Sequence, residues 1–131
     1  MRPLGRILLY GSLAIVLLHV AGSLVLRIFA VPNGSGGSGF SSLIYAFTGF
    51  FAASVRGWKG AALAGLVLAL VDVTIGWGIA WMIAPGRRPA GMSITPGAWL
   101  TIASMMALSA VTYALIGAAI ARFSRGGPQW A

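Results

Sequence analysis

The sequence has no cysteine and only one acidic residue, Asp72, among its 131 residues. Without cysteine the chain forms no disulfide, thiolate metal site or iron–sulfur cluster, and it offers no cysteine nucleophile. With one carboxylate it also lacks the pair of acids that glycoside hydrolases use. Charged residues make up 8% of the chain, against about 25% in soluble globular proteins. Apolar residues make up 59%, so the composition predicts a single transmembrane domain over residues 1–131.

Four apolar runs are long enough to form membrane-spanning helices. Such a helix needs about 20 residues to cross a hydrocarbon core about 30 Å thick. The runs predict helices at residues 7–31, 40–58, 60–84 and 97–121. The first run resembles a signal peptide, because basic residues precede it. It is longer than the usual apolar region of about 7 to 15 residues and ends without an A-x-A-like cleavage site, so we expect a retained helix.

Short polar segments connect the predicted helices. Residues 33–39 are rich in glycine and serine and predict a flexible loop. The turn at residues 56–59 is so short that the helices on either side must be antiparallel neighbours. A polar loop follows Pro85, and residues 122–131 form a basic tail. Together these features predict an all-α, four-helix integral membrane bundle.

The basic residues lie at the ends of the apolar runs. The N-terminus, the turn at residues 56–59 and the C-terminal tail carry six of the nine lysines and arginines, and the opposite ends carry three. Because cytoplasmic loops are enriched in these residues, both termini are predicted to be cytoplasmic. The scattered charge argues against nucleic acid as a partner, which would need a basic patch on one face. Eight arginines against one lysine, with abundant alanine and glycine, favour a bacterial cytoplasmic membrane.

An internal similarity links the two halves of the chain. Residues 13–32 align without a gap with residues 66–85, and the alignment places His19 on Asp72. Such a repeat predicts two tandem helical hairpins related by a pseudo-two-fold axis along the membrane normal, although apolar sequences also produce such matches by chance. Independently of the repeat, His19 and Asp72 lie at nearly the same distance from their basic helix ends, close to the bilayer midplane.

Asp72 requires a partner, because an aspartate at the centre of a membrane helix costs roughly 2.5 to 3.5 kcal/mol on insertion scales. One interpretation is a structural pair with His19 that fixes helix register, supported by Ser12, Ser23 or Thr74. Another is a proton- or cation-responsive site, since histidine titrates near neutral pH. In a third, the partner of Asp72 is Arg27 or a residue of another chain. The sequence leaves all three open.

His19 is also a candidate axial ligand of haem or chlorophyll, because neutral imidazole is a common metal ligand. The chain has no second histidine for bis-histidine ligation, so we predict no metal and no cofactor. The sequence contains no nucleophile elbow, phosphate-binding loop or metalloenzyme motif. We therefore expect no enzymatic activity.

Small residues form stripes on two of the predicted helices, and such stripes let membrane helices pack closely. On the helix at residues 60–84 the stripe includes Asp72, which places the carboxylate in a helix–helix seam. Its small members are Ala61, Gly65, Ala69, Gly76 and Ala80. The row on the helix at residues 97–121 is Ala103, Ala107, Ala110, Ala114 and Gly117. Phenylalanines on the helix at residues 40–58 predict a face toward lipid or a partner, and these are Phe40, Phe47, Phe50 and Phe51.

These features predict a non-enzymatic membrane protein that acts through helix contacts, as an accessory or assembly subunit of a membrane complex or as a homo-oligomeric component. Its expected partners are the lipid bilayer and either other membrane-protein chains or further copies of itself. The alternative is a small proton- or ion-coupled transporter or channel that uses Asp72 and His19. The two differ at Asp72, which must be dry and paired in a subunit and must contact water in a transporter.

Overall fold

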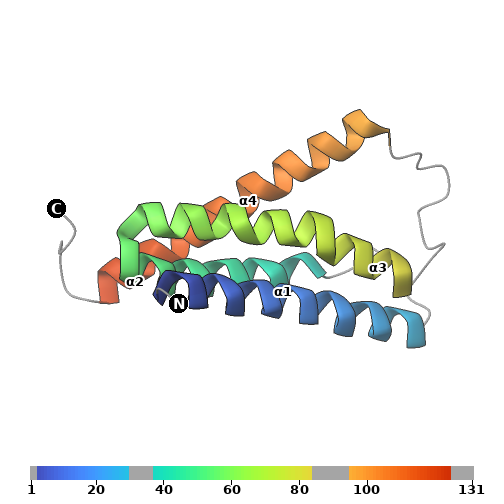
Figure 1. The fold of residues 1–131 in the computed structure, drawn as a ribbon, viewed down its shortest axis with the longest axis horizontal. Helices are drawn as coiled ribbons and strands as arrows, with labels where there is room; N and C mark the ends of the chain where they lie inside the picture. Colours follow the sequence, from blue (N-terminus) through green and yellow to red (C-terminus); the bar gives the residue numbers. More distant parts are fainter. Residues whose placement is uncertain (1–2, 30–36, 84–94, 125–131) are drawn as a thin grey trace.

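The computed structural model describes residues 3–29, 37–83 and 95–124, which are helical almost throughout (Figure 1). Within these ranges there is no strand. In chain order the elements are α1 (Pro3–Ile28), α2 (Gly37–Val71), the π-helical turn η1 (Asp72–Gly76), α3 (Trp77–Ile83) and α4 (Pro96–Ser124). Residues 37–39, predicted as loop, begin α2, and residues 122–124, predicted as tail, end α4. The remaining residues of that loop and tail lie outside the described ranges.

Three helical segments are long and apolar enough to cross a membrane: Pro3–Ile28, Gly39–Ala80 and Pro96–Ser124. The predicted second and third helices fall together in the second segment, which has 42 residues. They are not separate elements because only Arg56 (φ −137°, ψ 21°) and Gly57 (φ 60°, ψ −159°) leave helical geometry between them. The predicted count of four helices is therefore not confirmed, although the interruption lies in the predicted turn.

The two halves of α2 fold back on each other at this interruption, and the ribbon in Figure 1 reverses direction there. Gly57 suits the bend because glycine tolerates a positive φ that strains residues with a side chain. Directly after it, a Cβ on Gly60 would lie 2.7 Å from the carbonyl oxygen of Ala52, so the backbones approach closely. Further on, Ala53 and Ala61 pack in one buried cluster.

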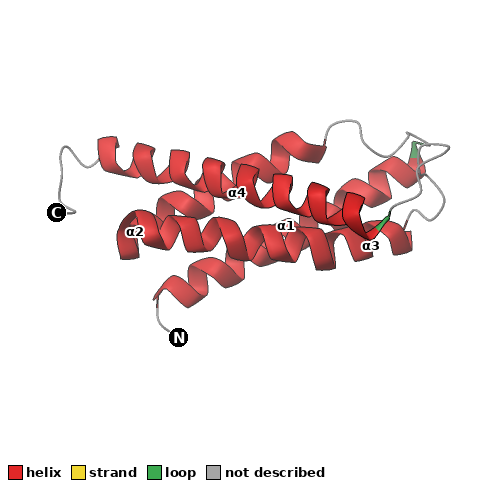
Figure 2. Cartoon of the chain, turned by 90° about the horizontal axis from the view of Figure 1, so that it is seen from above, coloured by secondary structure: helices red, strands yellow, loops and turns green. Residues whose placement is uncertain are grey.

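The folded-back α2 lies between the other two long helices. Helix α4 packs against α2, and α1 packs against α2, η1 and α3 (Figures 1 and 2). The predicted pseudo-two-fold axis relates the contact between α1 and α4 to the contact between the two halves of α2. The two contacts would therefore be equally close. Among the described residues α1 and α4 have no such interface. The predicted symmetry is therefore not confirmed.

Glycines allow α2 and α4 to touch at the backbone. A Cβ on Gly49 would lie 2.5 Å from the Cα of Ala114, and one on Gly65 would lie 2.7 Å from the Cα of Val111. A Cβ on Gly117 would lie 2.8 Å from the carbonyl carbon of Ala46. Close backbone contact of this kind is how membrane helices associate when lipid supplies no hydrophobic driving force.

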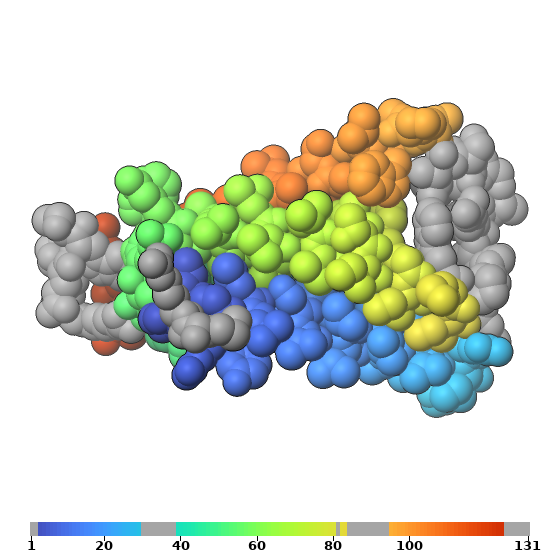
Figure 3. Space-filling view, in the orientation of Figure 1, coloured from blue at the N-terminus to red at the C-terminus, as the bar shows by residue number. Residues whose placement is uncertain are grey.

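The N-terminal half of α4 leaves this interface. Figure 1 shows it leaning away from α3, and Figure 3 shows its orange part as a ridge beside the yellow-green surface of α2. No residue between Thr95 and Ser109 is fully buried, and the first buried residue along α4 is Ala110. The exposed part of the helix carries large apolar side chains such as Leu100, Met105 and Leu108.

The residues of the two predicted small-residue stripes occupy different depths in the molecule. Those that are buried are Ala61, Gly65, Ala69, Gly76, Ala110, Ala114 and Gly117. Ala80, Ala103 and Ala107 are half-buried. The half-buried residues lie toward the ends of η1–α3 and α4 where these helices diverge, so the packing is closest near the bend of α2.

Candidate functional site

Asp72, the only acidic residue of the chain, is the centre of the candidate site. It is 1% exposed, and both of its carboxylate oxygens are hydrogen-bonded. The hydroxyl of Tyr45 donates to Oδ2, and Nε2 of His19 is bonded to Oδ1. Three helical segments therefore meet at one carboxylate: α1 through His19, α2 through Tyr45 and η1 through Asp72.

The backbone changes its geometry where Asp72 begins the π-helical turn η1. The backbone N–H of Trp77 bonds to the carbonyl oxygens of Asp72 and Thr74, and the hydroxyl of Thr74 donates to the carbonyl of Leu70 at 2.6 Å. Single π-helical turns insert an extra residue into an α-helix and are frequent at functional sites. Here the inserted residue changes the rotation of the helix between Asp72 and α3.

Gly76 makes room for the imidazole of His19. Asp72 and Gly76 are four residues apart and face the same side of the helix, toward α1. A Cβ on Gly76 would lie 2.6 Å from Nε2 of His19, closer than side chains pack. Glycine at this position therefore lets the ring approach Asp72, which links the small-residue stripe to the hydrogen bond.

Tyr45 is the third member of the site. It is not among the possible partners of Asp72 predicted from the sequence. It is 4% exposed and belongs to the buried cluster formed with Ile15, Leu68 and other residues. A signal for it exists in the sequence, since Tyr45 lies 11 residues before Arg56 and Asp72 lies 13 residues after Lys59. In an antiparallel hairpin these distances from the turn put both side chains at a similar depth.

The other candidate partners of Asp72 lie elsewhere. Ser23 is buried and Ser12 is half-buried, and within the described residues neither is hydrogen-bonded to the carboxylate. Arg27 is exposed, and its Nη1 donates to the carbonyl oxygen of Ile83 at 3.3 Å, next to the end of α3. In this structure, then, the partners of Asp72 are His19 and Tyr45.

One of the four phenylalanines has a different environment from the others. Phe40, Phe47 and Phe51 are 62%, 66% and 53% exposed. Phe50 is half-buried and packs against a cluster of buried alanines, with its ring at 84° to that of Phe51 and 5.3 Å from it. Phe50 therefore lies partly against α4, beside Ala118 and Ala121, and the predicted face toward lipid or a partner stays a prediction.

The electrostatics of the site follow from this geometry. A buried polar group is stable only when its hydrogen bonds are made, and among the described residues no buried side-chain nitrogen or oxygen is left without a partner. His19 uses Nε2 for Asp72, so Nδ1 is the nitrogen left for any other ligand. The side chain of His19 is 19% exposed, against 1% for Asp72, so His19 forms the outer edge of the cluster.

The arrangement can hold three helical segments in one register, and it can carry a proton between neighbouring ionisable groups. No protein-family model, curated protein or solved structure matches this chain, and its function is therefore inferred from the geometry of its own residues.

Proposed function

We propose that this chain is a non-enzymatic integral membrane protein that acts through helix contacts, as an accessory or assembly subunit of a membrane complex or as a homo-oligomeric component. The single observation that carries the proposal is the state of Asp72, which is 1% exposed and bonded through both oxygens. A carboxylate that binds a transported ion must contact water at some stage. A carboxylate that fixes helix register must be dry and paired, which is the state observed.

The energetics favour a role in structural specificity for the hydrogen-bonded set of Asp72, His19 and Tyr45. Insertion of an aspartate at the membrane centre costs roughly 2.5 to 3.5 kcal/mol. Hydrogen bonds between membrane helices average about 0.6 kcal/mol and reach about 1.7 kcal/mol. The two bonds to Asp72 therefore offset only part of the insertion cost on average. Buried polar groups of this kind are kept in some proteins because they select one register and one arrangement over the alternatives, and we infer that role here.

The bend of α2 supports four membrane crossings, because the second of the three candidate segments folds back on itself and would cross the membrane twice. The part of the second segment before Arg56 begins at Gly39, and its 17 residues at about 1.5 Å each cover about 26 Å, close to the hydrocarbon thickness. The part after Gly57 runs antiparallel to it through η1 and α3. In this arrangement both termini lie on the same side.

The charges of the described residues support a cytoplasmic location for that side. Arg6 lies near the start of α1, Arg56 and Lys59 lie at the bend of α2, Arg122 lies near the end of α4, and all four are exposed. The start of α1, the bend of α2 and the end of α4 lie at one end of the molecule, whereas the end of α1, which carries Arg27, lies at the other (Figure 1). Cytoplasmic ends of membrane helices are enriched in lysine and arginine. We therefore propose that both termini are cytoplasmic, in the cytoplasmic membrane of a bacterium.

The exposed half of α4 is the surface that suits contact with another chain. The hydroxyls of Thr101, Ser104 and Ser109 donate to backbone carbonyls four residues earlier, at 3.0, 2.8 and 2.9 Å. Hydroxyls bonded in this way are satisfied within their own helix, so this face can enter an apolar environment. It can then pack against a helix of another chain.

Native mass spectrometry of the protein released gently from its membrane tests the proposal. The expected result is a complex of defined stoichiometry, either with other membrane chains or with further copies of this one. A purified wild-type protein that is a bare monomer in several mild detergents would contradict it. Flux measurements in proteoliposomes complete the test. A subunit role predicts that the protein supports no proton or cation flux that depends on Asp72, so wild type and Asp72→Asn should give the same result.

A second candidate function is a small proton- or ion-coupled transporter or channel that uses Asp72 and His19. The observation that favours it is the hydrogen-bonded chain from the 19% exposed side chain of His19 to the buried carboxylate of Asp72, because such chains carry protons in membrane transporters. A pH jump across proteoliposomes loaded with a pH-sensitive dye tests it. Flux that is lost in Asp72→Asn and retained in Arg122→Gln would support this function over the first.

A further inference from the structure

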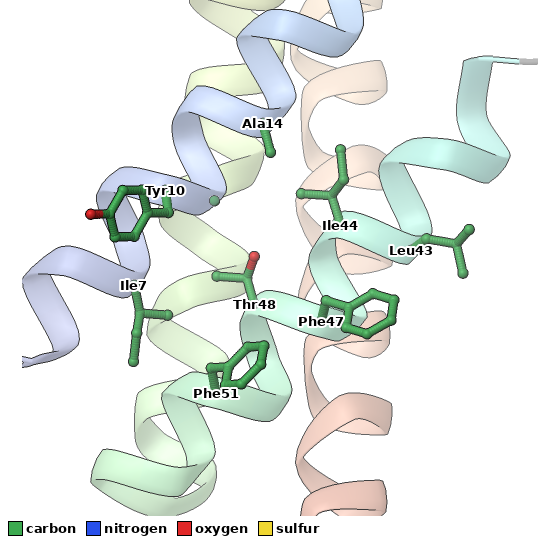
Figure 4. A pocket seen from close by; sticks show the side chains of 9 residues that line it. Ile7, Tyr10, Ala14, Leu43, Ile44, Phe47, Thr48 and Phe51 are labelled. Atoms are coloured by element: carbon green, nitrogen blue, oxygen red, sulfur yellow. The ribbon is translucent and has the colours of Figure 1, made fainter.

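An apolar groove of about 470 Å³ lies between α1 and the first half of α2 (Figure 4). This volume falls within the range of about 300 to 1,000 Å³ typical of small-molecule sites. The walls are large side chains, which include Ile7 and Tyr10 from α1 and Phe47 and Phe51 from α2. Tyr10, Phe47 and Phe51 are 68%, 66% and 53% exposed, so the groove opens on the outer surface of the helices.

The floor of the groove is formed by small residues where α1 and α2 touch. A Cβ on Gly11 would lie 2.7 Å from the hydroxyl oxygen of Thr48, so the helices are in close contact there. Ala14 continues the floor toward the centre of the molecule. The lining of α1 from Ile7 to Ala14 is about 10 Å long at about 1.5 Å per residue. The groove is thus apolar, and its lining on α1 runs from one end of the bundle toward its middle.

The outer end of the groove lies at the positively charged end of the molecule. Arg6 directly precedes Ile7, is exposed, and lies one helical turn from Tyr10 on the same face of α1. The chain has nine basic residues and a single acidic one, and that one, Asp72, is buried with His19 and Tyr45. No acidic side chain of this protein is therefore available to Arg6, and an anion from outside the chain is the complementary partner.

We propose that the groove binds one acyl chain of an anionic phospholipid, whose phosphate is held by the guanidinium of Arg6 and the hydroxyl of Tyr10. Arginine forms charge-assisted hydrogen bonds with phosphate oxygens, and tyrosine is enriched at the level of the head groups. The acyl chain runs along Gly11 and Ala14 between the aromatic walls. The site thus selects a lipid both by the charge of its head group and by a shaped path for its chain.

Competition between phosphatidylglycerol and phosphatidylcholine tests the site. The protein is reconstituted in bilayers that contain both lipids, extracted with mild detergent and analysed by native mass spectrometry for the lipid that remains bound. Wild type is expected to retain one phosphatidylglycerol in preference to phosphatidylcholine. Ala14→Phe fills the groove and is expected to lower retention about tenfold, which corresponds to the loss of about two buried methylene groups. Ala119→Phe is the matched control, because Ala119 is exposed on α4, outside the groove.

The head-group contact has its own control pair. Arg6→Gln is expected to lower the preference for phosphatidylglycerol about fivefold, the effect of one basic residue at an anionic surface. Arg122→Gln removes the same charge from the same end of the molecule, on α4, and is expected to change the preference less than twofold. Equal effects of the two arginine variants, or full retention in Ala14→Phe, would overturn the proposal and indicate unspecific lipid at the surface.

A diazirine on the acyl chain of phosphatidylglycerol supplies an independent measurement. Crosslinks are expected on residues 7–14 and 43–51 and to be lost in Ala14→Phe. An even spread of crosslinks over the lipid-facing surfaces of α1, α2 and α4 would contradict the proposal. Circular dichroism of each variant establishes that loss of lipid is not loss of helical structure.

Discussion

At the scale of single residues, Asp72 and the two side chains bonded to it, His19 and Tyr45, form a hydrogen-bonded polar cluster that joins three helical segments. Tyr45 and His19 each satisfy one oxygen of the carboxylate. Removal of either donor leaves a buried acceptor unpaired, and such a loss destabilises more than the removal of an exposed hydrogen bond. The contributions of the two donors can be measured separately by substitution.

Tyr45→Phe removes one hydroxyl and leaves the ring in place. We expect the free energy of unfolding in detergent micelles to fall by about 0.6 to 1.7 kcal/mol, the range of hydrogen bonds between membrane helices. Tyr113→Phe is the control, because Tyr113 is 40% exposed on α4 and should change the stability little. An equal effect of both substitutions would show that the hydroxyl of Tyr45 contributes no more to stability than an exposed hydroxyl, which would contradict the expectation.

Gly76→Ala tests whether the space at η1 positions His19. The added Cβ would lie 2.6 Å from Nε2 of His19, so the ring must move away from Asp72. Overpacking of this kind typically costs about 1 to 3 kcal/mol. Gly78→Ala, two residues on, meets nothing within 4 Å and is expected to be neutral or to stabilise the helix slightly. Thermal unfolding of the two variants, with the imidazole resonances of His19 followed by NMR, checks both expectations.

At the scale of helices, the contact between α2 and α4 depends on several glycines, whereas α1 combines one glycine contact with the hydrogen bond between His19 and Asp72. Gly49, Gly65 and Gly117 bring backbones together along the first interface. Helix α1 meets α2 at Gly11 and meets η1 through His19. The two interfaces therefore respond to different kinds of substitution.

Gly117→Ala places a methyl group against the backbone of Ala46 and Phe50, which cannot move aside as a flexible side chain does. We expect a loss of about 1 to 3 kcal/mol of stability and a wider separation of α2 and α4. Gly97→Ala, on the same helix, meets nothing within 4 Å and serves as the control. Distances between spin labels on α2 and α4 report the separation, and unchanged distances in Gly117→Ala would contradict the expectation.

At the scale of the whole molecule, the topology can be read from labelling with a membrane-impermeant maleimide. The chain has no cysteine, so one introduced cysteine is the only thiol. Trp58→Cys and Phe123→Cys are expected to react from the cytoplasmic side, and Phe29→Cys from the opposite side, because these side chains are 64%, 84% and 71% exposed. Reaction of Trp58→Cys and Phe123→Cys from different sides would exclude a bend of α2 that returns the chain through the membrane.

Much of this architecture is readable from the sequence, but the residues that pair are less so. The long apolar runs predicted helices that the structure contains, and the charges of residues 56–59 marked the bend. The pairing of Asp72 with His19 was one of three interpretations, and Tyr45 was not among the predicted partners. The sequence groups Phe50 with the other three phenylalanines, and only the structure shows that it packs partly against the alanines of α4.

The sequence by itself determined the helical class, the apolar character and the position of the bend, because run length, charge and glycine content are properties of the linear chain. Only the tertiary structure decided which residues meet Asp72 and that α1 and α4 lie apart. These depend on the rotation of each helix about its axis. In segments where almost every residue is apolar, all faces of a helix have a similar hydropathy. The rotation of the helix about its axis is therefore selected by close packing and hydrogen bonding.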